Sequence, residues 1–238
     1  LICFDAVISF AERHAKLAEE MAAKTEDEEW KNELLEISRI CRKVPAQPAG
    51  TFYEALQSCW FVFVALMIEG WGAGMSLGRA DQYLYPYYKN DLTNGVLDET
   101  GAHELLCLLL IKMNGVINLQ DETVAMMMGG YPVMQGVTVG GIDKNGEDAV
   151  NELSYMFIDA EQAVGLTSED LVVRINKKNP DSFVLKACEA AKELRGKLKF
   201  VSDETTIQSM LSGGIEIEAQ LFAGLARLRG IAGPDGKH

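Results

Sequence analysis

The sequence is poor in histidine and has no closely spaced pair of cysteines. Its 238 residues include three histidines, and none pairs with a nearby cysteine or histidine at metal-ligand spacing, which argues against a structural zinc site. The five cysteines are widely spaced and odd in number, so a disulfide framework is not expected and a reducing compartment is favoured. These residues are His14, His103, His238, Cys3, Cys41, Cys59, Cys107 and Cys188.

Basic charge is also scarce. The formal net charge is −13 at pH 7, and no stripe of lysine or arginine occurs. Tight binding to nucleic acid needs such a stripe, and an acidic surface is poorly suited to anionic lipid. No secretory signal is visible, and the most apolar run, Cys59–Ile68, is too short to span a bilayer. We therefore expect a cytoplasmic protein without nucleic-acid or membrane partners.

Complete nucleotide-binding loops are missing as well, although residues 70–79 contain four glycines. The spacing is GxGxG, and Met75 or Leu77 stands where a dinucleotide fingerprint has its third glycine. The preceding run has helical character, and no Gly-Lys-Ser/Thr phosphate loop occurs. Ser76 has no histidine near it in sequence, so no catalytic triad is predicted. Nucleotide binding at this turn is a minor hypothesis.

Hydrophobic periodicity predicts a helical first half and an α/β second half. Thr51 and Glu54 predict a capping box at the start of a very apolar helix. No linker rich in Pro, Gly or Ser divides the halves, so one domain is expected. The predicted helices cover residues 4–23, 28–41, 52–68, about 98–118, 148–163 and 179–195, and the predicted strands cover 137–139, 171–175 and 200–201.

One long motif carries a family resemblance. Residues 78–88 read GRADQYLYPYY and closely resemble the GR-x-DQYLYPYY signature of the pyruvate formate-lyase domain in glycyl radical enzymes. Other matching segments keep order and spacing from about residue 10 to 212, while the tail at 215–238 departs from the family. The resemblance is closest to the glycerol dehydratase-like branch. The other segments are VPA at 44–46, TFYEALQ at 51–57, ELL at 104–106, IKMN at 111–114, GGYP at 129–132, TVGG at 138–141, NELSY at 151–155, VR at 173–174 and DE at 203–204.

The resemblance implies a fold and a mechanism. The fold is the helix-rich portion of a pyruvate formate-lyase-like α/β barrel, incomplete in this chain. In the family, an activating enzyme with an iron–sulfur cluster and S-adenosylmethionine installs a radical on a glycine. That radical passes to a cysteine, whose thiyl form takes hydrogen from the substrate. A closed apolar barrel suits this chemistry because it excludes water and other quenchers.

The resemblance also implies what this chain does not supply. The family's catalytic cysteine lies in a GCVE-like motif and its radical glycine in an RVAGY-like loop, and the 238 residues contain neither. None of the five cysteines matches the catalytic position, so no catalytic residue is assigned. No cofactor is expected to bind directly. A first residue that is not methionine also predicts an internal fragment. The implied partners are a small-molecule substrate, the activating enzyme and a second copy in a full-length homodimer.

Two segments are predicted to line the substrate pocket. One is the turn at 71–76, where relatives commonly read SNGHSIS, and the other is the loop at 134–135, where relatives often place an aromatic. Gly74 and Met134 replace groups that contact substrate hydroxyls in some dehydratases, which argues against glycerol. Trp71 and Met75 favour a more apolar, aryl-type substrate. The candidates are Trp71, Gly74, Met75, Ser76, Met134 and Gln135.

The expected function is therefore that of a fragment of a glycyl radical lyase. The parent would cleave a C–O, C–N, C–S or C–C bond as a dehydratase or decarboxylase, or have a formate acetyltransferase-like activity. The alternative is a non-catalytic remnant or binding protein. Lys197 and Lys199 depart from the family, because relatives are apolar at these two positions.

Overall fold

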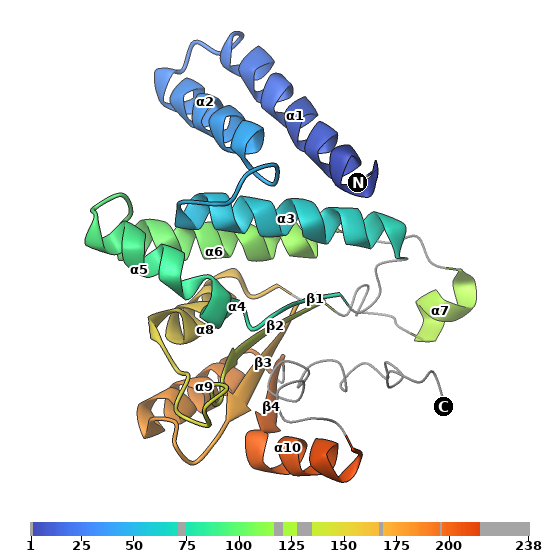
Figure 1. Cartoon of the computed structure of the whole chain (residues 1–238), viewed down its shortest axis with the longest axis vertical. Helices are drawn as coiled ribbons and strands as arrows, with labels where there is room; N and C mark the ends of the chain where they lie inside the picture. Colours follow the sequence, from blue (N-terminus) through green and yellow to red (C-terminus); the bar gives the residue numbers. More distant parts are fainter. Residues whose placement is uncertain are drawn as a thin grey trace. The chain divides into compact units, whose positions relative to one another are not determined.

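The computed structural model shows a helix-rich α/β chain (Figure 1). It divides into two compact units, one of residues 1–71 and 86–102 and the other of residues 72–85 and 103–238. The expectation of a single family domain stays a prediction, because one family domain can hold more than one compact unit. The structure describes residues 2–70, 75–116, 121–127, 135–166, 169–195 and 197–214.

The first unit begins with a hairpin of two helices, α1 (Ile2–Ala22) and α2 (Glu28–Lys43). Alanines at positions 11, 15, 18 and 22 of α1 are buried and let α2 approach closely. Asp27, in the acidic run between the helices, caps the N-terminus of α2: its side chain accepts hydrogen bonds from the backbone N–H groups of Glu29 and Trp30. The predicted helices at 4–23 and 28–41 are confirmed within two residues.

Helix α3 (Phe52–Glu69) starts where the sequence predicts, with the Thr51 side chain accepting from the backbone N–H of Glu54 at 3.2 Å. The predicted capping box is only half formed. The Glu54 carboxylate accepts from the Gly50 N–H and from Arg39 and Lys43 instead of reaching back to Thr51. Glu54 is buried, and burial opposes its ionisation, but these hydrogen bonds outweigh burial and lower its pKa to about 2.

Only some of the apolar side chains of α3 are buried. Phe52, Phe61 and Phe63 are buried, while Leu66 and Ile68 are 48% and 75% exposed. By length and composition α3 is apolar enough to cross a membrane, a property that core helices of soluble proteins share. The same unit contains most of α5 (Tyr85–Thr93) and the first turn of α6 (Glu99–Asn114).

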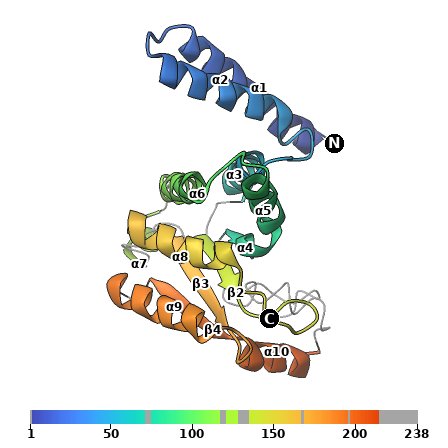
Figure 2. The same cartoon turned by 90° about the vertical axis from the view of Figure 1, so that its left-hand side faces the viewer.

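The second unit is built on a parallel sheet in the order β1-β2-β3-β4. The strands are β1 (Ser76–Gly78), β2 (Gln135–Gly140), β3 (Glu169–Ile175) and β4 (Leu198–Ser202). Three of them confirm predicted strands, each longer than expected. Parallel neighbours need crossover connections. Helix α8 (Glu152–Val164) connects β2 to β3, and helix α9 (Asp181–Glu193) connects β3 to β4. In Figure 1 these two helices lie to the left of the strands, on the side that faces the viewer in Figure 2.

Several elements were not predicted from the sequence. They are β1, α4 (Ala80–Tyr83), α5, α7 (Glu122–Met127) and α10 (Asp203–Ser212). The first three occupy the glycine- and tyrosine-rich stretch, whose short pieces carry no sustained period. Helix α8 begins at Glu152, four residues later than expected, because Asn151 forms the capping box and Asp148 is part of a turn.

Candidate functional site

The two predicted pocket segments meet at the start of β1 and β2. The backbone N–H of Gly136 donates to the carbonyl of Met75 at 3.1 Å. The Ser76 hydroxyl donates to the Gly136 carbonyl at 2.6 Å and accepts from the Gly78 N–H at 3.0 Å. Ser76 therefore joins the two strands, a structural role that the sequence did not reveal. Trp71, Gly74 and Met134 lie outside the described residues.

Gln135 is the most unusual of the described candidates. The sequence places it in a loop, but it is the first residue of β2 and is fully buried. Neither polar atom of its amide has a hydrogen-bond partner among the described residues. A buried group left in this state costs about 1–3 kcal/mol. Such a group calls for an explanation, and Gln135 as a pocket residue stays a prediction.

The other end of β2 holds a pair of glycines in an unusual backbone conformation. Gly140 and Gly141 have φ angles of 75° and 78°. A Cβ on Gly140 would lie 2.6 Å from the ring of Phe183, and one on Gly141 would lie 2.6 Å from a carboxylate oxygen of Asp203. Both positions therefore need glycine for conformation and for space, which explains the TVGG segment.

Arg79 and Asp81 of the long motif bind the backbone of this turn. The Arg79 guanidinium donates to the carbonyls of Gly140 and Ile142, each at 2.9 Å. Burial lowers the pKa of Arg79, and the neighbouring Arg174 lowers it further. Asp81 is fully buried and accepts from the Gly140 N–H at 2.8 Å and the Ser154 hydroxyl at 2.6 Å. Burial raises the pKa of Asp81, and the hydrogen bonds oppose that rise.

A second buried carboxylate, that of Asp203, also binds the turn at Gly140 and Gly141. Asp203 accepts from the Arg174 guanidinium at 2.6 Å and from the Ile142 N–H at 2.8 Å. The amide of Asn179 donates to the Gly141 carbonyl at 2.8 Å. The matched motifs at 78–88, 138–141, 151–155 and 203–204 thus converge on one turn. Their shared task in the described structure is to hold the carboxyl ends of the strands together.

The cysteines and histidines give one surprise. His103 and Cys107 lie one turn apart in α6, and the Cys107 sulfur is 3.8 Å from a ring nitrogen of His103. The sequence prediction concerned pairs at metal-ligand spacing and overlooked this contact, in which a helical spacing of four residues brings a histidine and a cysteine to one face. Burial raises the pKa of the Cys107 thiol. Among the described residues no group of three or more metal-ligating side chains occurs.

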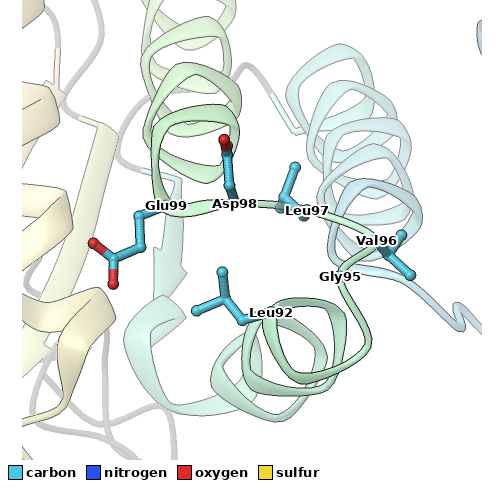
Figure 3. A pocket seen from close by; sticks show the side chains of 6 residues that line it. All are labelled: Leu92, Gly95, Val96, Leu97, Asp98 and Glu99. Atoms are coloured by element: carbon cyan, nitrogen blue, oxygen red, sulfur yellow. The ribbon is translucent and has the colours of Figure 1, made fainter.

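A surface depression lies elsewhere, in the turn between α5 and α6 (Figure 3). It has a volume of about 640 Å³ and is open to solvent. Asp98, one of its carboxylates, accepts from the Gly101 N–H and so serves the start of α6. The depression contains none of the predicted pocket residues. Its lining consists of Leu92, Gly95, Val96, Leu97, Asp98 and Glu99.

The parallel strands, their helical crossovers and the hydrogen-bonded turn at Gly140 and Gly141 define a fragment of an α/β barrel. The family model for pyruvate formate lyase-like proteins matches residues 1–233, a longer span than the ordered motifs alone. The chain belongs to the pyruvate formate lyase-like family, whose members include glycyl radical lyases and dehydratases. The predicted recognition, fold class and enzyme class are confirmed.

Relatives and solved structures agree with this assignment. The chain is 38% identical to isethionate sulfite-lyase of Nitratidesulfovibrio vulgaris, over 90% of the chain and 26% of that protein. It is 34% identical to trans-4-hydroxy-L-proline dehydratase of Clostridioides difficile, over 98% of the chain and 29% of that protein. The glycerol-bound B12-independent glycerol dehydratase from Clostridium butyricum superposes with a TM-score of 0.86 at 40% identity, over 90% of the chain and 27% of that structure. The chain thus spans less than a third of each.

Proposed function

We propose that this chain forms part of the barrel wall of a glycyl radical lyase or dehydratase that acts on a small molecule. The single observation that carries the proposal is the family match over 233 residues, supported by relatives named as lyases and dehydratases. The catalytic cysteine and the radical glycine are contributed by sequence outside these 238 residues. In isolation the chain is inactive.

The proposed chemistry is a hydrogen-atom relay. The cysteine thiyl takes a hydrogen atom from a substrate C–H bond, which forms S–H and leaves a carbon radical. Loss of the neighbouring leaving group gives a product radical, and this radical takes the hydrogen back from the thiol. The thiyl is regenerated, so one activation serves many turnovers. The glycine radical is installed by an activating enzyme with an iron–sulfur cluster and S-adenosylmethionine.

The surroundings of the enzyme follow from the same proposal. The full-length protein is a cytoplasmic homodimer with a small-molecule substrate and the activating enzyme as partners. No nucleic acid and no membrane takes part, in keeping with the net charge of −13. A radical intermediate requires a reducing, anaerobic setting, and widely spaced free cysteines suit such a compartment.

Gln135 is proposed to contact the substrate. Its amide is buried at the start of β2 and has no hydrogen-bond partner within the described part of the chain, next to the segment that Ser76 fixes. A bound substrate with hydroxyl, carboxylate or carbonyl groups would supply the missing partners and repay the cost of burying the amide. Met75 immediately precedes β1, and its carbonyl accepts a hydrogen bond from the N–H of Gly136, the residue after Gln135.

Substitution of Gln135 by leucine in the full-length, activated enzyme separates function from stability. We expect Gln135→Leu to keep or raise the melting temperature, because an unpartnered amide is removed, while kcat/KM falls roughly tenfold or more. The matched control is Gln82→Leu. The Gln82 amide donates to the Ala149 carbonyl at 2.7 Å, so this change should lower the melting temperature.

The proposal for Gln135 is refuted if the Gln135→Leu enzyme turns over substrate as well as the wild type. A full-length protein that never acquires a radical would instead contradict the proposed function as a whole and support the non-catalytic alternative.

A further inference from the structure

Strand β1 pairs irregularly with β2. Ser76 is the register partner of Gly136, whereas Gly78 is the partner of Val137, the next residue of β2. Two steps along β1 thus match one step along β2, and Leu77 is the extra residue of a β-bulge. Gly78 has a φ of 70°, a left-handed conformation that favours glycine. Bulges are frequent beside active sites, where they redirect a side chain.

Two hydroxyl side chains bind the polar backbone groups of this bulge. The Ser76 hydroxyl accepts from the Gly78 N–H at 3.0 Å and donates to the Gly136 carbonyl at 2.6 Å, so it bridges the strands at the irregularity. The Tyr83 hydroxyl donates to the carbonyl of Leu77 at 3.0 Å. The bulge is therefore held in one conformation by hydrogen bonds from its own segment of the chain.

The bridge through Ser76 ends on the residue that follows Gln135. The Gly136 N–H donates to the Met75 carbonyl at 3.1 Å, and the Gly136 carbonyl accepts from Ser76. Gly136 has no side chain, so its backbone would otherwise have access to many conformations. Two consecutive residues, Met75 and Ser76, bind both of its polar backbone groups, and these bonds restrict the backbone that carries Gln135.

This restriction explains how the buried Gln135 amide stays without a hydrogen-bond partner within the described part of the chain. A buried amide in that state is unfavourable, and a more flexible backbone would let it turn toward a nearby donor or acceptor. The hydrogen bonds of Ser76 oppose such a rearrangement. Ser76 and Gln135 should therefore be energetically coupled, although they belong to different strands.

We propose that Ser76 is a positioning residue that acts through the Gly136 carbonyl and keeps the amide of Gln135 directed at the substrate. This inference rests on the proposed role of Gln135 and adds a residue to the same site. The role of Ser76 is then indirect, whereas the family resemblance places Ser76 itself in the pocket wall. Tyr83 supports the bulge through the Leu77 carbonyl.

Two simpler explanations make different predictions. If Ser76 only joins the strands, its loss lowers stability by the same amount whichever residue stands at position 135. If the Ser76 hydroxyl contacts the substrate directly, its loss and the loss of the Gln135 amide reduce turnover independently. Both explanations predict additive effects of the two substitutions, and positioning predicts effects that are not additive.

The first test is a double-mutant cycle on the melting temperature of the full-length protein, which needs neither activation nor substrate. Gln135→Leu should keep or raise the melting temperature when the Ser76 hydroxyl is present. In the Ser76→Ala background the released amide can reach a partner, so Gln135→Leu should lower the melting temperature. Ser76→Thr keeps a hydroxyl and should restore the response of the wild type.

Ser154→Ala provides the matched control. The Ser154 hydroxyl belongs to a buried residue and donates to Asp81 at 2.6 Å, and Asp81 binds the carboxyl end of β2 through the Gly140 N–H. This substitution should lower the melting temperature, because a buried carboxylate loses a donor. The response to Gln135→Leu should nevertheless stay as in the wild type.

Turnover gives the second readout, in the assay used for Gln135→Leu. Ser76→Ala should reduce kcat/KM several-fold in the activated enzyme and have little further effect in the Gln135→Leu background. The positioning role is overturned if Gln135→Leu shifts the melting temperature equally with and without the Ser76 hydroxyl, or if the two losses in kcat/KM multiply. A protein that shows the coupling in melting temperature but never acquires a glycyl radical contradicts the proposed function instead.

Discussion

At the scale of single residues, the described structure is held by buried carboxylates that each satisfy several donors. Glu54 binds Arg39, Lys43 and the Gly50 N–H in the first unit. Asp81 binds backbone and hydroxyl donors in the second. Apart from the contact between Glu54 and Gly50, no sequence pattern predicts these contacts, because the partners are distant in the sequence. The sequence shows where carboxylates occur, but the network depends on which elements meet.

Glu54 gives a pH-dependent prediction. Its pKa falls from 4.5 in the unfolded chain to about 2 in the folded protein, so its contribution is present above pH 4.5 and is lost as pH falls toward 2. Glu54→Gln should therefore lower the free energy of unfolding by roughly 2–3 kcal/mol at pH 7. The gap between variant and wild type should narrow by pH 3, as measured by urea denaturation.

A control variant separates the effect of the buried Glu54 carboxylate from that of losing an ion pair with Arg39. Glu36 also pairs with Arg39, but the Glu36 side chain is 47% exposed. Glu36→Gln should cost less than about 1 kcal/mol. A difference between Glu54→Gln and the wild type that stays constant from pH 7 to pH 3 would contradict the assigned role of ionised Glu54.

At the scale of elements, the long periodic helices and the β-branched strands were predictable. Helices α1, α2, α3 and α9 begin and end close to the predicted residues, because their apolar spacing or caps are unambiguous. The short strand β1 was not predictable, since its three residues form a strand only by pairing with β2, which is distant in the sequence. The candidate site was predicted by resemblance alone. No local pattern predicts that Gln135 is buried as the first residue of β2, because the pairing of parallel strands is a tertiary property.

The carboxyl end of β2 gives a prediction about an element. Gly140→Ala adds a methyl group 2.6 Å from the Phe183 ring at a φ of 75°, so both strain and overlap oppose it. We expect a loss of roughly 3 kcal/mol or more in the free energy of unfolding. Gly146→Ala has nearly the same φ, 77°, and nothing within 4 Å of the added carbon, so it should cost only about 1 kcal/mol. If chemical denaturation gave the same loss of unfolding free energy for Gly140→Ala and Gly146→Ala, steric overlap at Gly140 would not be the cause.

At the scale of the whole molecule, the described chain leaves large apolar side chains uncovered. Leu66 and Ile68 on α3, Leu108 and Ile111 on α6, and Phe200 on β4 are between 43% and 75% exposed. Exposure on this scale is characteristic of surfaces that contact further protein. It is consistent with a chain that spans 26–29% of its curated relatives. We expect the 238 residues expressed alone to have low solubility.

Electron spin resonance tests the central claim most directly. The full-length protein is treated anaerobically with its activating enzyme and S-adenosylmethionine, in parallel with the 238-residue chain. The account predicts a glycyl radical doublet from the full-length protein and none from the 238-residue chain. A doublet from the 238-residue chain, or no doublet from a folded full-length protein under conditions that activate another glycyl radical enzyme, would contradict it.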